Sequence, residues 1–354
     1  MDSKKPWVLG VHTLMPYVQK NDAVIQKTIL RENKGMLPPY VIAMGDTRRV
    51  RATASLLDEG SAVVLNDLML EHGDNPGRVC VAVGTYKGTP VAMFEHQMGS
   101  SGAEIIVKEV IADGIMTNKF SLGNKVFNSD AKYMIRVGSA AGINCNDEGK
   151  KELRQPVVEA YDCVVANKQV GISCADYSAL CGSLNAFERG DAGQVKTALK
   201  SMGYKFQDNW PVLETDKTLT SILSEKISEQ VEIQNDKKTE KDVKLGKVYS
   251  LGNVSKDSLY AETEEEAFMS LRRNLDVGCS EMEFATISRV GANKTALGDP
   301  VRTAMAACIL GSIPGDSFAE IDKSVANLVT RSALVGALET LHKVSLSHIQ
   351  NGRE

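Results

Sequence analysis

Short apolar runs and amphipathic segments alternate along most of the chain, as in proteins that mix strands and helices. Strands are predicted at 41–44, at 79–97 as a hairpin turning at Lys87–Thr89, and at 133–137, 157–166, 248–251 and 305–310. Apolar residues at helical spacing predict helices after the turn at 45–47, after 98–102, and at 219–227, 262–274, 280–292 and 321–347. This alternation places the chain in the α/β class.

The stretch Tyr133–Asn144 is the most informative part of the pattern. Its first half is apolar, as a buried strand requires, and the residues at 138–142 have almost no side-chain bulk. We therefore expect the strand to end there and a ligand to reach the backbone. Arg136 lies just before this opening. Because a buried unpaired charge is costly, Arg136 requires an anionic partner, either a phosphate or a carboxylate such as Glu95 or Asp130 in a structural ion pair.

A second candidate anion site follows the strand at 41–44. Asp46 or Thr47 can cap the helix that begins there, and the free N–H groups of the first turn attract anions. Arg49 adds a positive charge to this turn. A solvated arginine is the simpler interpretation of Arg49, but its place after a strand and a Gly-Asp turn favours an anion site. His96, on an apolar strand, is interpreted as a core or interface histidine.

Composition narrows the classes of function. Hydrophobic residues make up 43% of the 354 residues, which is enough for a sizeable core, and 41 Lys and Arg against 45 Asp and Glu give a net charge of −4. This balance favours a small-molecule partner over nucleic acid or a membrane surface. No apolar run reaches the roughly 18–20 residues of a membrane span. The seven scattered cysteines and the absence of an apolar signal segment indicate a cytoplasmic protein.

Five motifs in one order resemble those of the nucleoside phosphorylase-I family, and within it the uridine phosphorylase branch. They are VIAMGDTRRV, GTYKGTPVAMFEHQMGSS, YMIRVGSAAGI, GNVSKDSLY and SEMEFAT. The resemblance covers 40–145 and 245–345. It implies an α/β/α sandwich with a central mixed, partly barrel-like β-sheet. It also implies a single domain over 1–354 with insertions near 13–38, 167–210 and 229–247, the last of them highly charged and expected to be solvated.

The resemblance implies reversible phosphorolysis, in which a nucleoside and inorganic phosphate give a free base and ribose 1-phosphate. By family position, the phosphate contacts are Gly45, Arg49, Arg136 and Ser139, and the ribose contacts are Glu281, Met282 and Glu283. Arg49, Arg136 and Glu283 are the implied catalytic residues. Compensation of a helix dipole is the simpler interpretation of the two glutamates, but it explains two carboxylates flanking an apolar Met less well.

The positions that read the base depart from the family pattern. Leu259, Thr263 and Glu265 stand where uridine phosphorylases have an aromatic residue, a Gln and an Arg. The Ser-Asp pair of the purine branch is also absent, since Ser312 is followed by Ile313. Uridine remains the favoured substrate, in nucleoside salvage. The alternatives are a purine nucleoside phosphorylase, a phosphate-independent nucleosidase, which would not need the two arginines, and a non-catalytic nucleoside-binding protein.

The resemblance also implies a homodimer or a higher oligomer built from dimers. His12 and Arg78 are the candidates for residues that a neighbouring subunit would contribute, and Glu71 is a candidate for a structural cation site at the subunit interface. Inorganic phosphate is the expected co-substrate. No organic cofactor and no catalytic metal are expected.

Overall fold

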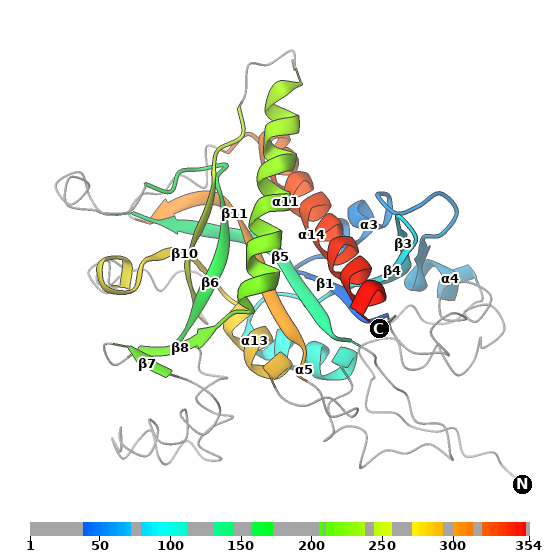
Figure 1. Cartoon of the computed structure of the whole chain (residues 1–354), viewed down its shortest axis with the longest axis horizontal. Helices are drawn as coiled ribbons and strands as arrows, with labels where there is room; N and C mark the ends of the chain where they lie inside the picture. The colour runs from blue at the N-terminus through cyan, green and yellow to red at the C-terminus, as the bar shows by residue number, and fades with distance from the viewer. Residues whose placement is uncertain are drawn as a thin grey trace, which may run out of the picture.

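The computed structural model describes residues 38–71, 79–111, 131–144, 157–172, 205–207, 210–237, 244–256, 271–292, 300–313 and 321–351. Within these ranges, eleven strands form one mixed sheet with helices on both faces (Figure 1). The strands are β1 (Tyr40–Met44), β2 (Val63–Val64), β3 (Val81–Tyr86), β4 (Thr89–Glu95), β5 (Tyr133–Ile143), β6 (Cys163–Ile172), β7 (Lys205–Gln207), β8 (Trp210–Glu214), β9 (Val248–Lys256), β10 (Val277–Glu281) and β11 (Arg302–Ile313). The helices are α3 (Thr47–Ala54), α4 (Leu65–Glu71), α5 (Ser100–Ile111), α11 (Lys217–Asp236), α13 (Phe284–Ala292) and α14 (Lys323–Asn351).

Five strands of this sheet close on themselves. The main path runs β2-β3-β4-β1-β5-β10-β9-β6-β8-β7, and β11 pairs with both β5 and β6. The ring β5-β10-β9-β6-β11 is therefore a small barrel, from which β1, β4, β3 and β2 extend as an open wing. The predicted α/β class and the mixed, partly barrel-like sheet are confirmed.

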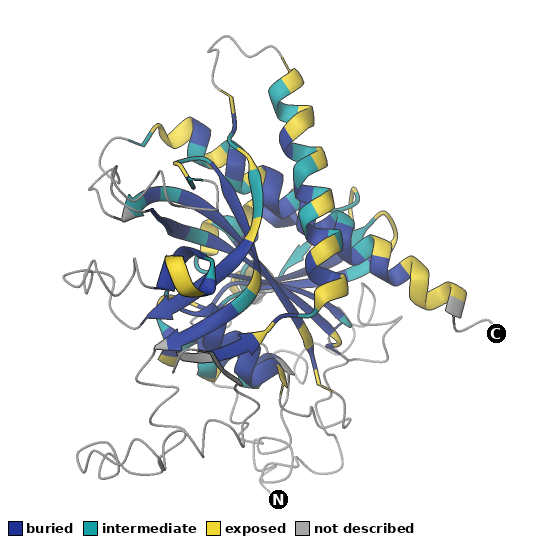
Figure 2. Ribbon diagram, turned by 60° about the vertical axis from the view of Figure 1, so that its left-hand side comes forward, coloured by how far each residue is buried: buried dark blue, intermediate teal, exposed yellow. Residues whose placement is uncertain are grey.

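The two larger of the three apolar clusters among the described residues lie on opposite sides of the strands. One joins the barrel to α5 and α13 through residues such as Ile106 and Ile287, and the other lies under α11 and α14 around Leu223 and Leu338. Figure 2 shows the buried sheet between helices whose outer sides are exposed. At the contact between α11 and α14 a Cβ built on Gly336 would lie 2.6 Å from Ile227 Cγ1, so the two backbones approach closely there. Among the described helices, none combines the length and the apolar character needed to cross a membrane.

Two parallel strands, β1 and β4, end level with the middle of the parallel strand β5. β1 pairs in parallel with β4 and with β5, and Met44 is level with Glu95 on one side and Val137 on the other. The residues that follow, Gly45 and His96, therefore lie at the same edge as the second half of β5. Ligands of α/β proteins commonly bind beyond the carboxyl ends of parallel strands.

The prediction that the strand ends after Val137 is wrong. β5 continues to Ile143, because β11 pairs with residues 138–143 on one side and β10 pairs with residues 141 and 142 on the other. Small residues are needed there for packing as well: a Cβ on Gly142 would lie 3.0 Å from the Val158 carbonyl oxygen.

Several other boundaries differ from the sequence prediction. β6 begins at Cys163 because residues 159–162 form a turn, closed by a hydrogen bond from Glu159 N to Asp162 Oδ2 (2.7 Å). β9 runs to Lys256, five residues beyond the strand predicted at 248–251. β10 occupies the start of the helix predicted at 280–292, which begins instead at Phe284.

The charged run expected as a solvated loop is helical as far as Asp236. Ile227 and Val231 of α11 are buried one turn apart, so the apolar stripe continues while charged residues occupy the exposed side. The strand residues at 167–172 likewise fall inside a predicted insertion. Positions 1–37 and 173–204 lie outside the described residues, as does most of the helix predicted at 262–274.

Candidate active site

The turn between β1 and α3 forms as the sequence predicts. Asp46 has extended backbone angles, and its side chain accepts a hydrogen bond from Arg49 N at 3.1 Å, which caps the helix. The Arg49 side chain is anchored at both ends of its guanidinium: Nε lies 3.4 Å from Asp46 Oδ2, and Nη2 donates to Ser139 Oγ at 3.3 Å. Two of the predicted phosphate ligands are therefore in contact.

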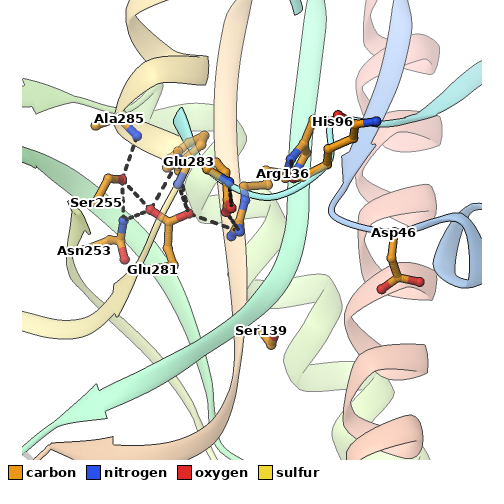
Figure 3. A network of polar contacts seen from close by, with 12 residues as sticks. Asp46, His96, Arg136, Ser139, Asn253, Ser255, Glu281, Glu283 and Ala285 are labelled. Atoms are coloured by element: carbon orange, nitrogen blue, oxygen red, sulfur yellow. Dashed lines mark hydrogen bonds and ion pairs between the residues drawn. The ribbon is translucent and has the colours of Figure 1, made fainter. Parts of the chain in front are cut away.

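Arg136 is buried between two carboxylates. Its Nη2 lies 3.1 Å from Glu281 Oε2 and also contacts Glu283 Oε2 (Figure 3). Burial alone would lower the pKa of Arg136, but the adjacent glutamates outweigh burial and raise it. Arg136 Nε and Nη1 are buried and have no hydrogen-bond partner in the part of the chain that the structure describes.

A structural ion pair of Arg136 with Glu95 or Asp130 was the alternative interpretation. Glu95 instead accepts hydrogen bonds from Thr47 Oγ1 (2.7 Å) and Cys80 N (3.1 Å), and Asp130 lies outside the described residues. The ion pair exists, but its carboxylates are the two glutamates predicted to bind ribose. The absence of a side chain at Gly138 makes room for this ion pair, because a Cβ there would lie 2.6 Å from Arg136 Cζ.

Glu281 is held by a polar network that the sequence did not reveal. Its Oε1 accepts from Asn253 Nδ2 at 2.8 Å and from Ser255 Oγ, and its Oε2 accepts from the backbone N of Glu283 at 2.8 Å. Asn253 Nδ2 also donates to Gln169 Oε1 at 2.7 Å. Both oxygens of Glu281 are thus occupied, and the N–H groups at the start of α13 stabilise its charge.

The turn after β4 holds the second glutamate. Gly99 N donates to Glu283 Oε1 at 2.8 Å. The turn carries two residues with positive φ, Gln97 at 63° and Gly99 at 87°. Positive φ is uncommon for a residue such as Gln, and strained backbone of this kind is concentrated at functional sites.

His96 is fully buried beside these charges. Its Nδ1 lies 2.7 Å from the Gln97 carbonyl oxygen, whereas its Nε2 has no partner among the described residues. Burial, followed by the positive charge of Arg136, lowers the pKa of His96 to about 3, so the ring is neutral near pH 7. It was expected to be a core or interface histidine with its hydrogen bonds satisfied, but the described residues provide a partner for only one of its two nitrogens.

The predicted site residues form two groups. Arg136, Glu281 and Glu283 form the first, while Arg49 and Ser139 form the second; Arg136 and Ser139 are three positions apart on one strand and so face opposite sides of it. His96 links them, since a Cβ on Gly45 would lie 3.9 Å from His96 Cε1 and 4.0 Å from Arg49 Nη1. In Figure 3, His96 lies between the Arg136 cluster and Asp46.

Other predicted residues are placed less fully. Met282 is partly exposed between the two buried glutamates, and Glu71 is exposed at the end of α4. Among the described residues, no group of three or more His, Cys, Asp or Glu side chains could hold a metal ion. The predicted base contacts and neighbour-subunit residues lie outside the described ranges: Leu259, Thr263, Glu265, His12 and Arg78.

Comparison with solved structures finds the same fold in uridine phosphorylases. A uridine phosphorylase of the oomycete Phytophthora capsici is 15% identical, over 87% of this chain and 93% of that chain, with a TM-score of 0.58. A uridine phosphorylase of Vibrio fischeri ES114 is 19% identical, over 88% and 94%, with a TM-score of 0.54. A structure of the Vibrio fischeri protein complexed with 6-hydroxy-1-naphthoic acid gives 18% identity, 87% and 92% coverage, and a TM-score of 0.53. The sequence matches no protein-family model and no curated protein.

Proposed function

We propose that this chain is a nucleoside phosphorylase that transfers the ribosyl group of uridine to inorganic phosphate. The observation that carries the proposal is the environment of Arg136. Its Nη2 is shared by Glu281 and Glu283, while its buried Nε and Nη1 donors have no partner within the described ranges. Leaving buried donors unpaired costs free energy, so an anion that accepts from them gains that free energy on binding.

Phosphate is proposed to bind beyond the ends of β1 and β4, next to Gly45, between the group of Arg49 and Ser139 and the group that contains Arg136. Arginine suits this role because its planar guanidinium can donate to two phosphate oxygens together. Phosphate would then share Arg136 with the glutamates and weaken its hold on Glu283. Glu283 can exchange Arg136 for another hydrogen-bond donor, because each of its oxygens has a single donor among the described residues. Gly99 N donates to Oε1, and Arg136 Nη2 donates to Oε2.

Glu283 is accordingly proposed to accept hydrogen bonds from the ribose hydroxyls. A phosphate oxygen forms a bond to C1′ while the bond from C1′ to the base nitrogen breaks, and its electron pair leaves with the base. The sugar passes through a cation-like state, which the negative charges of phosphate and Glu283 stabilise. Glu281, whose oxygens are already occupied, is proposed to orient Arg136 rather than to contact ribose directly.

The preference for uridine has a different basis. It rests on the resemblance of the motifs and on the fold shared with proteins named uridine phosphorylases. The proposal includes a cytoplasmic homodimer that uses phosphate and no organic cofactor.

Cleavage of nucleosides, followed by ultraviolet difference spectroscopy, tests the proposal. Uridine, thymidine, inosine and adenosine are each offered with and without phosphate. Phosphate-dependent release of uracil is the expected result. Inosine or adenosine cleavage would contradict the uridine preference, and cleavage without phosphate would indicate a hydrolytic nucleosidase. If no nucleoside is cleaved by folded protein at saturating phosphate, the enzyme assignment is wrong.

Neighbouring arginines provide a matched control. Arg49→Met removes the charge that contacts Ser139, whereas Arg48→Met removes a charge whose side chain is 93% exposed in the same turn. Loss of a charged hydrogen bond of about 1.5–3 kcal/mol predicts a roughly 10- to 150-fold rise in the KM for phosphate in the first variant. The second variant should behave like the wild type. Equal effects of the two substitutions would indicate a general loss of positive charge and no specific contact.

A further inference from the structure

Nε2 of His96, which has no hydrogen-bond partner in the part of the chain that the structure describes, has a defined chemical state. The carbonyl oxygen of Gln97, 2.7 Å from His96 Nδ1, can only accept a hydrogen bond, so Nδ1 must carry the hydrogen. A neutral imidazole has one N–H, which leaves a bare lone pair at Nε2. The ring is neutral because burial and Arg136 disfavour its protonated form. His96 therefore presents a hydrogen-bond acceptor at a site otherwise dominated by cationic donors.

The position of this acceptor is fixed by its surroundings. His96 N donates to Met44 O at 2.7 Å, which ties the residue to the end of β1 next to Gly45. The left-handed conformation of Gln97 places the carbonyl that orients the ring. The ring is fully buried, and its Cε1, which adjoins Nε2, lies near the Cβ position of Gly45 that Arg49 also approaches. An anion held by Arg49 and Arg136 would meet this lone pair.

A lone pair facing an anion is favourable only if the anion carries a hydrogen. Both ionic forms of phosphate that exist near neutral pH keep at least one P–OH group, whereas sulfate keeps none. An oxygen of sulfate would place its own lone pairs against Nε2 and leave a buried acceptor unsatisfied. Sites whose buried polar groups lose their partner in this way reject the analogue strongly.

We propose that His96 Nε2 accepts a hydrogen bond from the P–OH group of bound phosphate and thereby selects protonated tetrahedral anions over sulfate. The inference deepens the proposed function, because it names a specificity determinant of the same phosphate site. His96 acts in binding, and no proton needs to move to it.

Isothermal titration calorimetry of the full chain with phosphate, arsenate and sulfate tests the inference. Arsenate is the matched probe, since it keeps an As–OH group at neutral pH and has the same charge as phosphate. Wild-type protein should bind phosphate and arsenate about 10- to 100-fold more tightly than sulfate. His96→Phe keeps a planar ring without nitrogens, so phosphate and arsenate should weaken toward sulfate while sulfate binding changes little.

His342→Phe is the control, because it removes another histidine hydrogen bond, to Thr89 Oγ1 at 2.8 Å, on the distant helix α14. It should keep the selectivity. Wild-type protein that binds sulfate as tightly as phosphate would overturn the inference, as would selectivity that survives in His96→Phe. If His96→Phe does not fold, wild-type protein that binds sulfate as tightly as phosphate would still overturn the inference. Selective phosphate binding without nucleoside cleavage would refute the proposed function alone, and absence of phosphate binding would refute both.

Discussion

Gly138 can be tested directly, because it is the residue that makes room for the buried arginine. A Cβ at this position would lie 2.6 Å from Arg136 Cζ and Nη1 and 2.7 Å from Nη2. An arginine tip can usually move aside at little cost. This one is held by Glu281 and Glu283 and is only 3% exposed, so it has no solvent to move into. Gly138→Ala must therefore strain the ion pairs or break them.

The size of the effect follows from two limits. Overpacking of a core costs about 1–3 kcal/mol, and breaking a buried ion pair costs about 3–5 kcal/mol. We expect Gly138→Ala to lower the free energy of unfolding by about 3 kcal/mol in urea denaturation followed by circular dichroism. Gly102→Ala in α5 is the matched control, since the nearest atom to its Cβ would be the His96 carbonyl oxygen at 3.5 Å, an ordinary contact. That helix substitution should be neutral or stabilising by up to about 1 kcal/mol.

A double-mutant cycle separates the clash with Arg136 from other effects. In the Arg136→Met background the guanidinium is gone, and Gly138→Ala should cost at least about 1 kcal/mol less than in the wild type. Equal costs in both backgrounds would refute the reasoning. If Gly138→Ala lowers the free energy of unfolding of the wild type by less than about 0.5 kcal/mol, the reasoning is refuted as well. A change that small is typical of exposed positions, where the side chains can move aside.

Three further predictions concern other parts of the molecule. Because the pKa of His96 is lowered to about 3 in the folded state, the unfolded chain takes up a proton below about pH 6.5 that the folded chain does not. The free energy of unfolding should therefore decrease as pH is lowered from about 6.5 to about 3, by up to about 1.4 kcal/mol per pH unit from this group. His96→Phe should flatten this slope, which urea denaturation at a series of pH values measures. Gly336→Ala should lower the free energy of unfolding by about 1–3 kcal/mol, since its Cβ would lie 2.9 Å from the Cα of Ile227; an unchanged unfolding midpoint would mean that α11 and α14 can separate freely. The buried thiols Cys80, Cys163, Cys279 and Cys308 should resist alkylation in native protein and react only after unfolding, as peptide mass spectrometry can check; burial raises the pKa of Cys80 to about 11.

Much of the fold followed from local patterns. The β3–β4 hairpin, the Asp46 cap of α3 and the long helix α14 each depend on neighbouring residues, so periodicity and turn chemistry were enough to predict them. β10 was missed because only Val277 and Cys279 mark it as apolar, and its pairing partners, β9 and β5, are remote in the chain.

The site was predictable in part for the same reason. Arg49 and Arg136 stand out in sequence as charges at turns and in strands. The partners of Glu281 do not, because Asn253 and Ser255 lie beyond the end of the strand predicted at 248–251. The pairing of Arg136 with Glu283 depends on barrel closure, which no local pattern encodes. The second nitrogen of His96 could be identified as unsatisfied only once its neighbours were known.

The closed ring of strands also has a consequence for folding kinetics. Gly99 and Glu283 are 184 positions apart along the chain, and Arg136 and Glu283 are 147 apart, so the site joins segments that are distant in sequence. Contacts of such long range form late, because a large loop entropy must be lost before they are made. Helical signal should therefore return early in refolding, and the ability to bind phosphate should return last. A nascent or truncated chain that ends before β10 would have Arg136 but not Glu281 and Glu283, the two carboxylates that pair with it.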